Sequence, residues 1–149
     1  MLVSEILRIK GTVLFTTRPD TLVLDAVKVM AQHDIGSLVV MDRGRMAGLI
    51  TFAEVLKALA ERGGTLGTMV VTEVFDPSPL TAEPGLEVME LRRVMLERHA
   101  RYVPVMDGTT LAGVVSFHDV AKAVLEEQSF ENRMLKSYIK DWPDEGAGR

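Results

Sequence analysis

The chain has 149 residues, 47% of them hydrophobic and 26% charged, which is enough to bury a core in one domain or in two closely packed halves. A formal net charge of −4 gives no overall positive field, so nucleic acid and anionic membranes are not expected as partners. The absence of cysteine excludes disulfides, thiolate metal sites and a cysteine nucleophile. The sequence shows neither a secretory signal nor a run of about 18 apolar residues, and we expect a cytoplasmic protein.

The first half of the chain predicts alternating helical and extended segments. VSEIL (3–7) indicates a short helical start that leads into an extended stretch. Residues 23–31 place apolar side chains at i, i+3, i+4, i+7 and i+8, which is typical of an amphipathic helix. SLVVMD (37–42) and MAGLIT (46–51) flank the turn sequence DRGR and predict a β-hairpin. FAEVLKALAER (52–62) then predicts a second helix.

The second half of the chain repeats this order. Residues 15–59 align without a gap on residues 80–124 and share 14 identities in 45 positions. VSEIL also matches VTEVF (71–75), at an offset of 68 residues. We therefore predict an α/β (α+β) fold made of two pseudo-symmetric β-α-β-β-α repeats packed through their sheets. The expected units are residues 1–60, a glycine-rich linker at 61–69, residues 70–128, and a C-terminal helix and tail at 129–149.

The C-terminal segment carries an apolar stripe outside the repeats. At helical spacing it contains Phe130, Met134, Leu135, Tyr138 and Ile139. Such a stripe has to pack on its own domain or on a partner. We expect it to reinforce a homodimer.

One short motif occurs in both repeats, as GLITFAE (48–54) and GVVSFHD (113–119). Each copy has glycine, two apolar residues, a hydroxyl residue, phenylalanine, one residue that differs and an acid. Within the repeat, this motif resembles that of a tandem pair of CBS (cystathionine-β-synthase-type) domains, called a Bateman module. The resemblance covers about residues 1–127, and YVPVMD (102–107) is similar to a recurring strand end of that family.

The resemblance implies that adenine nucleotides (AMP, ADP, ATP or NAD) bind in two clefts between the repeats. The hydroxyl residue lies at a helix N-cap, where a phosphate meets free backbone N–H groups, and the carboxylate accepts protons from ribose hydroxyls. The first implied site combines Ser116, His118 and Asp119 with Gly11, Thr12, Val13, Ile35, Gly36 and Ser37. The second combines Thr51 and Glu54 with Pro77, Ser78, Ala100, Arg101 and Tyr102.

The resemblance further implies a regulatory module without catalytic activity, catalytic cofactor or metal, and we expect its effector to be a separate protein. Two alternatives stay open. The first alternative is a ligand-free dimerisation scaffold. The second is a small enzyme that uses His118 and Asp119. The enzyme requires His118 to face the same cleft as Ser116, although residues adjacent on a helix point about 100° apart and do not form a Ser-His-Asp relay.

Overall fold

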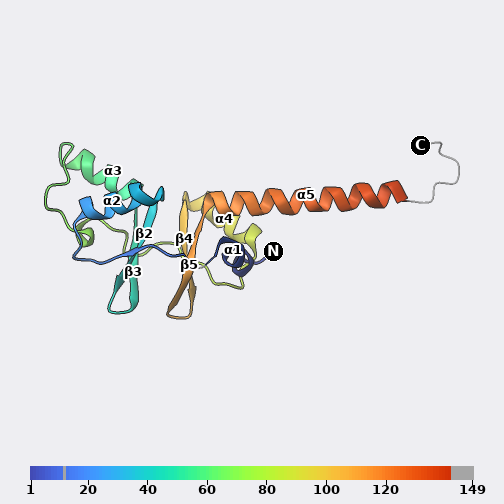
Figure 1. Cartoon of the computed structure of the whole chain (residues 1–149), viewed down its shortest axis with the longest axis horizontal. Helices are drawn as coiled ribbons and strands as arrows, with labels where there is room; N and C mark the ends of the chain where they lie inside the picture. Colours follow the sequence, from blue (N-terminus) through green and yellow to red (C-terminus); the bar gives the residue numbers. More distant parts are fainter. Residues whose placement is uncertain (12, 142–149) are drawn as a thin grey trace.

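The computed structural model describes residues 1–11 and 13–141, and Figure 1 shows their arrangement. The elements in chain order are α1 (Val3–Lys10), β1 (Thr16–Thr17), α2 (Val23–His33), β2 (Ser37–Asp42), β3 (Arg45–Thr51), α3 (Phe52–Glu61), a 3-10 turn η1 (Val71–Glu73), α4 (Val88–Arg98), β4 (Tyr102–Asp107), β5 (Thr110–Ser116) and α5 (Phe117–Asp141). We call β1 to α3 the first repeat and α4 to α5 the second repeat. This mixed fold of two similar halves confirms the predicted fold class.

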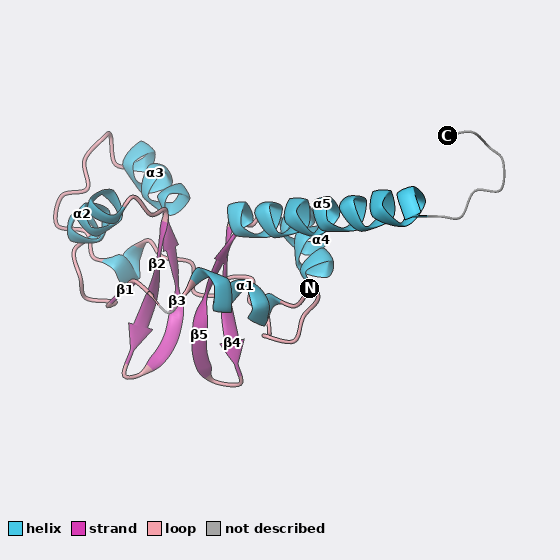
Figure 2. Ribbon diagram, turned by 45° about the vertical axis from the view of Figure 1, so that its right-hand side comes forward, coloured by secondary structure: helices cyan, strands magenta, loops and turns pink. Residues whose placement is uncertain are grey.

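Two antiparallel hairpins form the centre of the molecule and lie side by side (Figures 1 and 2). In the first repeat, β1 adds a short parallel strand to β2. In the second repeat, the corresponding strand is a single parallel bridge between Ala82 and Val105. Both hairpins shift register at the same place, after Val40 and after Val105, opposite Gly48 and Gly113. The sequence repeat is therefore also a repeat of backbone detail.

The segment that opens each repeat in the sequence packs into the other repeat. Val3 and Ile6 of α1 are buried with the core of the second repeat, among residues from α4, β4, β5 and α5. Met69 and Val71 are buried with the core of the first repeat, among residues from α2, β2, β3 and α3. Figure 2 shows α1 beside β5, on the side of the second repeat. This exchange joins the two repeats through their cores as well as their sheets.

The helix predicted to close the second repeat and the separate C-terminal helix form one continuous helix, α5, which extends beyond the rest of the fold (Figure 1). No glycine or proline occurs between Phe117 and Asp141, so the backbone has no residue that would end the helix. The stripe residues described above are 55–58% exposed on this helix. Residues 142–149 of the predicted tail lie outside the described residues. Among the helices of the described part, none is long and apolar enough to cross a membrane.

Two glycines at equivalent hairpin positions meet different neighbours, which predicts different costs for the same substitution. A Cβ at Gly48 would meet the backbone carbonyl of Asp76 and, at 2.6 Å, the ring of Phe75. Asp76 is fixed by two backbone hydrogen bonds with Leu49, of 2.8 and 2.9 Å. We expect Gly48→Ala to lower the free energy of unfolding by about 1–3 kcal/mol, which is the usual effect of overpacking a core. Urea denaturation measures the change.

The matched variant is Gly113→Ala, whose Cβ would meet only the flexible side chain of Leu7, at 2.8 Å from Cδ2. We expect a smaller loss there. Gly85→Ala, where nothing lies within 4 Å, is expected to change stability by less than about 0.5 kcal/mol. Equal losses at positions 48 and 113 would contradict this account of the packing.

Candidate functional site

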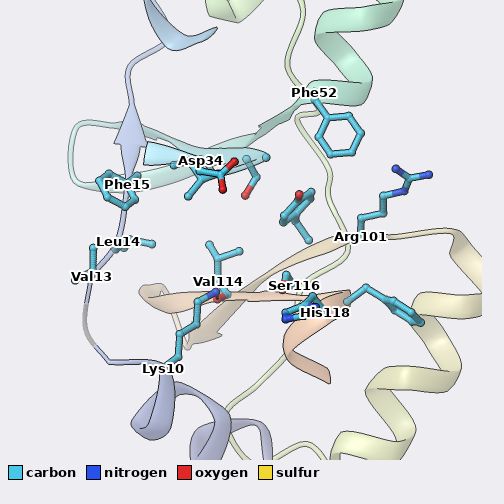
Figure 3. Close-up of a pocket in the computed structure, with 15 residues that line it drawn as sticks. Lys10, Val13, Leu14, Phe15, Asp34, Phe52, Arg101, Val114, Ser116 and His118 are labelled. Carbon is cyan, nitrogen blue, oxygen red and sulfur yellow. Dashed lines mark hydrogen bonds between the residues drawn. The ribbon is translucent and has the colours of Figure 1, made fainter. Parts of the chain in front are cut away.

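A cavity of about 570 Å³ lies between the two repeats, and we call it the first cavity. Its volume is within the roughly 300–1,000 Å³ usual for small-molecule sites. Figure 3 shows Phe15 and Asp34 on one wall, Val114, Ser116 and His118 on the opposite wall, and Lys10 rising from the end of α1. The walls therefore come from both repeats and from the exchanged N-terminal segment.

Most residues of the first predicted site line this cavity: Val13, Ile35, Gly36, Ser37, Ser116 and His118. Gly11 and Asp119 do not line it, and Thr12 lies outside the described residues. The side chain of Asp119 is 21% exposed and bonds to Lys10, which does line the cavity. The structure thus brings the residues predicted from both repeats together around one cavity. It places the Asp119 carboxylate behind Lys10, outside the cavity lining.

Ser116 and Asp119 form a reciprocal cap at the start of α5. The backbone N–H of Asp119 donates to Oγ of Ser116 at 3.0 Å, and the backbone N–H of Ser116 donates to Oδ2 of Asp119 at 2.9 Å. This capping box satisfies two N–H groups that a helix start leaves without partners. The motif therefore has a structural role in addition to any contact with a ligand.

Lys10 adds an ion pair to this cap. Its Nζ donates to Oδ2 of Asp119 at 2.8 Å and to the backbone carbonyl of Val114 at 2.9 Å. Burial by itself raises the pKa of Asp119, but hydrogen bonds from Lys10 and Ser116 outweigh burial and hold the pKa below its usual value of 3.8. Asp119 is therefore ionised at neutral pH.

This lowered pKa predicts a pH-dependent contribution to stability. A carboxyl group whose pKa is lower in the folded state than in the unfolded state stabilises the fold above its unfolded pKa and ceases to do so as pH falls through the folded value. We expect Asp119→Asn to lower the free energy of unfolding by about 1 kcal/mol at pH 7, with the difference from wild type shrinking below about pH 5. Urea denaturation from pH 7 to pH 2.5 measures this. A difference independent of pH would show that the ion pair is not its source.

A second cavity, of about 750 Å³, lies at the related position. Of the second predicted site, Thr51, Glu54, Ser78, Ala100, Arg101 and Tyr102 line it, and Pro77 does not. Thr51 and Glu54 cap α3 as Ser116 and Asp119 cap α5: Oε1 of Glu54 accepts from the Thr51 N–H at 2.9 Å, and Oγ1 of Thr51 accepts from the Ala53 N–H at 3.2 Å. The duplicated motif thus forms the same kind of cap at both cavities.

Four side chains line both cavities and form a shared wall: Phe52, Arg101, Tyr102 and Phe117. The Arg101 guanidinium lies 5.4 Å from the centroid of the Phe52 ring, and Tyr102 meets that ring edge-on at 6.1 Å. Gly36 leaves the space that the Tyr102 hydroxyl occupies, since a Cβ there would collide with it. Arg101 and Tyr102, predicted for the second site, therefore border the first cavity as well.

Several lining residues were missed by the sequence prediction. Phe52 and Phe117 occupy equivalent positions in the two repeats, and that identity within the motif could have revealed them. Lys10 was expected near the entrance of the first site as a solvated residue and was not assigned to it, and Phe15 and Asp34 have no such signal. Their places in the wall depend on how α1 and the end of α2 pack, which the repeat alone does not show.

His118 and Ser116 both line the first cavity, so the geometric condition set for the enzyme alternative is met. The described residues do not form the hydrogen bonds that a Ser-His-Asp relay requires. The hydroxyl of Ser116 accepts from the Asp119 backbone, and the Asp119 carboxylate bonds to Lys10 and to the Ser116 backbone. Within residues 1–11 and 13–141, no cluster of three or more His, Asp or Glu side chains could hold a metal ion.

Comparison with known proteins gives relatives across almost the whole chain. The mitochondrial CBS domain-containing protein CBSX3 of Arabidopsis thaliana is 31% identical over 148 residues, which cover 93% of this chain and 71% of the relative. The crystal structure of a CBS-domain containing protein from Agrobacterium tumefaciens is 29% identical, with a TM-score of 0.79, and covers 83% of this chain and 98% of its own.

A second similar structure contains ligands. The CBS domain pair of protein MJ0100, solved in complex with 5′-methylthioadenosine and S-adenosyl-L-methionine, is 25% identical, with a TM-score of 0.73. It covers 85% of this chain and 98% of its own. The family model of the CBS domain matches twice, at residues 3–61 and 71–126, and so includes both capping motifs, α1 and η1. The chain therefore belongs to the CBS domain family, as a protein with a pair of CBS domains.

Proposed function

We propose that this chain is a regulatory module that binds an adenine nucleotide in the first cavity. The observation that carries the proposal is the composition of that cavity, which combines hydroxyl groups, aromatic rings and cationic side chains from both repeats. Both ligands of the MJ0100 domain pair contain an adenosine moiety, which supports an adenine-containing ligand here. A ligand that binds one arrangement of the two repeats better than another shifts their equilibrium by its differential affinity, and that shift is the regulatory signal.

Each part of the nucleotide has a matching group. The adenine ring lies against the apolar wall of Val13 and Ile35, near the backbone of Gly36 and Ser37. The ribose hydroxyls donate to the Asp119 carboxylate, which lies behind Lys10 and of which Oδ2 already accepts two hydrogen bonds. The phosphate lies near Ser116, at the start of α5. Thr51 and Glu54 give the second cavity a weaker version of this arrangement, because Glu54 is one methylene longer than Asp119.

Titration calorimetry with AMP, ADP, ATP and NAD tests the proposal. We expect saturable heat with at least one of the four, which also identifies the physiological class of ligand. Absence of heat with all four, at millimolar ligand, would reject nucleotide sensing and favour the scaffold alternative.

Binding is proposed to occur without turnover. The Ser116 hydroxyl and the Asp119 carboxylate bond within the helix cap, the carboxylate also bonds to Lys10, and neither bonds to His118 in the described structure. The proposed receiver of the signal is a separate effector protein. Chromatography of each nucleotide after prolonged incubation with the protein is expected to show it unchanged, whereas a new product would support the enzyme alternative.

The chain is also proposed to act as a homodimer. Besides the stripe on α5, exposed large apolar side chains occur on the repeat helices, at Met89, Leu96 and Leu125. We expect Met134→Glu to weaken self-association by tenfold or more in sedimentation equilibrium, because it places a charge within the stripe. Ser129→Glu, on the polar face of the same helix, is the control and is expected to leave association unchanged. A monomeric wild-type protein would rule out this assembly.

A further inference from the structure

The first cavity contains an ammonium group that is fixed in place by two hydrogen bonds. Lys10 Nζ donates one proton to Asp119 Oδ2 and another to the backbone carbonyl of Val114. An ammonium group has three protons to donate, so one is left for a ligand in the cavity that Lys10 lines. Figure 3 shows the lysine extending from α1 toward Val114 at the cavity wall.

The position of this ammonium depends on the exchange of segments between the repeats. Lys10 is the last residue of α1, and Val3 and Ile6 anchor α1 in the core of the second repeat. Val114 and Asp119 belong to β5 and α5 of that repeat. The donor and the groups that hold it are therefore fixed to one rigid half, which means that little freedom remains to be lost when a ligand binds.

The second cavity has no equivalent of this lysine. The alignment of VSEIL with VTEVF, extended to position 10, places Ser78 opposite Lys10. Ser78 lines the second cavity, and its backbone N–H donates to Asp76. In the described part of the chain, Glu54 accepts a hydrogen bond from the Thr51 backbone and forms no ion pair. Arg98 and Arg101 also line the second cavity, but in the described part of the chain neither forms a printed bond to Glu54. The two cavities thus share the cap, and they differ in whether a cation is bonded to the capping acid.

We propose that Lys10 makes the first cavity selective for adenine nucleotides that carry a phosphate over the same nucleosides without one, and that Asp119 is a positioning residue for Lys10. The remaining N–H of the ammonium donates to a phosphate oxygen, a charge-assisted hydrogen bond that a neutral nucleoside does not form. Asp34, on the facing wall, repels phosphate from that side and favours the side of Lys10. This inference rests on the proposed function, because it describes the selectivity of the same cavity.

The test is a nuclear magnetic resonance titration of the full chain with AMP and, separately, with adenosine. The backbone amides of Ser116 and Thr51 report on the first and second cavities respectively, because each begins the cap beside its own cavity. At Ser116 we expect AMP to bind about tenfold or more tightly than adenosine. Lys10→Met is expected to remove most of that preference by weakening AMP binding while leaving adenosine binding within about twofold.

Three further variants separate the selectivity of the cavity from effects of overall charge and of folding. Arg8→Met removes the same charge from the same helix at an exposed position outside the cavity lining, and we expect it to keep the preference. Lys10→Arg restores a cation and is expected to keep the preference as well. If Lys10→Met does not fold, Lys10→Gln retains a donor for Val114 and is predicted to lose the preference in the same way.

The outcomes distinguish this inference from the proposed function. Adenosine and AMP binding equally at Ser116, or a preference that survives Lys10→Met, would overturn the role of Lys10 and leave nucleotide sensing intact. No shift of either amide with AMP or adenosine would overturn the inference and reject AMP as the ligand, whereas nucleotide sensing itself is rejected only when ADP, ATP and NAD also fail to bind.

Discussion

Replacing Asp119 with alanine is expected to weaken AMP binding in the first cavity by about 100-fold. The substitution removes the carboxylate proposed to accept the ribose hydroxyls and also the Oδ2 atom that holds Lys10 at 2.8 Å. Each hydrogen bond to a charged group contributes about 1.5–3 kcal/mol, so losing the ribose contact and the lysine anchor together gives an effect of this size. Titration calorimetry with AMP measures it.

Glu54→Ala is the matched control for this prediction. It removes the corresponding acid of the second cavity, where Glu54 also caps a helix through the N–H of position 51. Both substitutions therefore disturb a helix cap, at a cost of about 1 kcal/mol in stability. Only Asp119→Ala is expected to reduce affinity at the first cavity by two orders of magnitude. Similar losses in the two variants would show that cap stability, and not contact with the ligand, controls binding.

Shortening the Ile6 side chain to alanine is expected to destabilise the second repeat, although Ile6 precedes the first repeat in the sequence. Ile6 is 5% exposed and packs in the core formed with α4, β4, β5 and α5. Ile6→Ala is expected to lower the free energy of unfolding by about 2–5 kcal/mol, the range for large-to-small substitutions in cores. Hydrogen exchange is expected to accelerate most in β4 and β5, because local opening follows the loss of buried contacts.

Two substitutions calibrate that result. Ile9→Ala, on the same helix but 72% exposed, is expected to change stability by less than about 0.5 kcal/mol. Val71→Ala, in the exchanged segment of the other repeat, is expected to accelerate exchange mainly in β2 and β3. Faster exchange confined to β2 and β3 in Ile6→Ala would contradict the exchange of segments.

The duplication in the sequence was sufficient to predict the fold. Positions such as Val40 and Val105, or Gly48 and Gly113, recur at one offset and occupy the same places in two hairpins. Helical periodicity identified most of the buried face of α2, which consists of Val23, Ala26 and Met30, although Ala31 at the end of the predicted stripe is exposed. The exchange of α1 was not predicted, because the amphipathic pattern of a short helix shows that it packs against an apolar surface and not which of two similar surfaces it meets.

The cavity was predictable only in part, for the same reason. Ser116, Gly36 and Ile35 lie within the aligned repeats, and all three line the first cavity. Lys10 lies outside the 45 aligned positions, and its role follows from the tertiary position of α1. The continuous α5 was divided in the prediction because the repeat ends near residue 128, whereas the backbone has no residue there that stops a helix.

A crystal structure of the wild-type protein, determined from crystals grown with AMP, tests the central claim most directly. The proposed function predicts electron density for one nucleotide in the first cavity, with its ribose at Asp119 and its phosphate within hydrogen-bond distance of Lys10 and the start of α5. An empty first cavity at saturating AMP, with or without density for AMP elsewhere on the molecule, would contradict the claim.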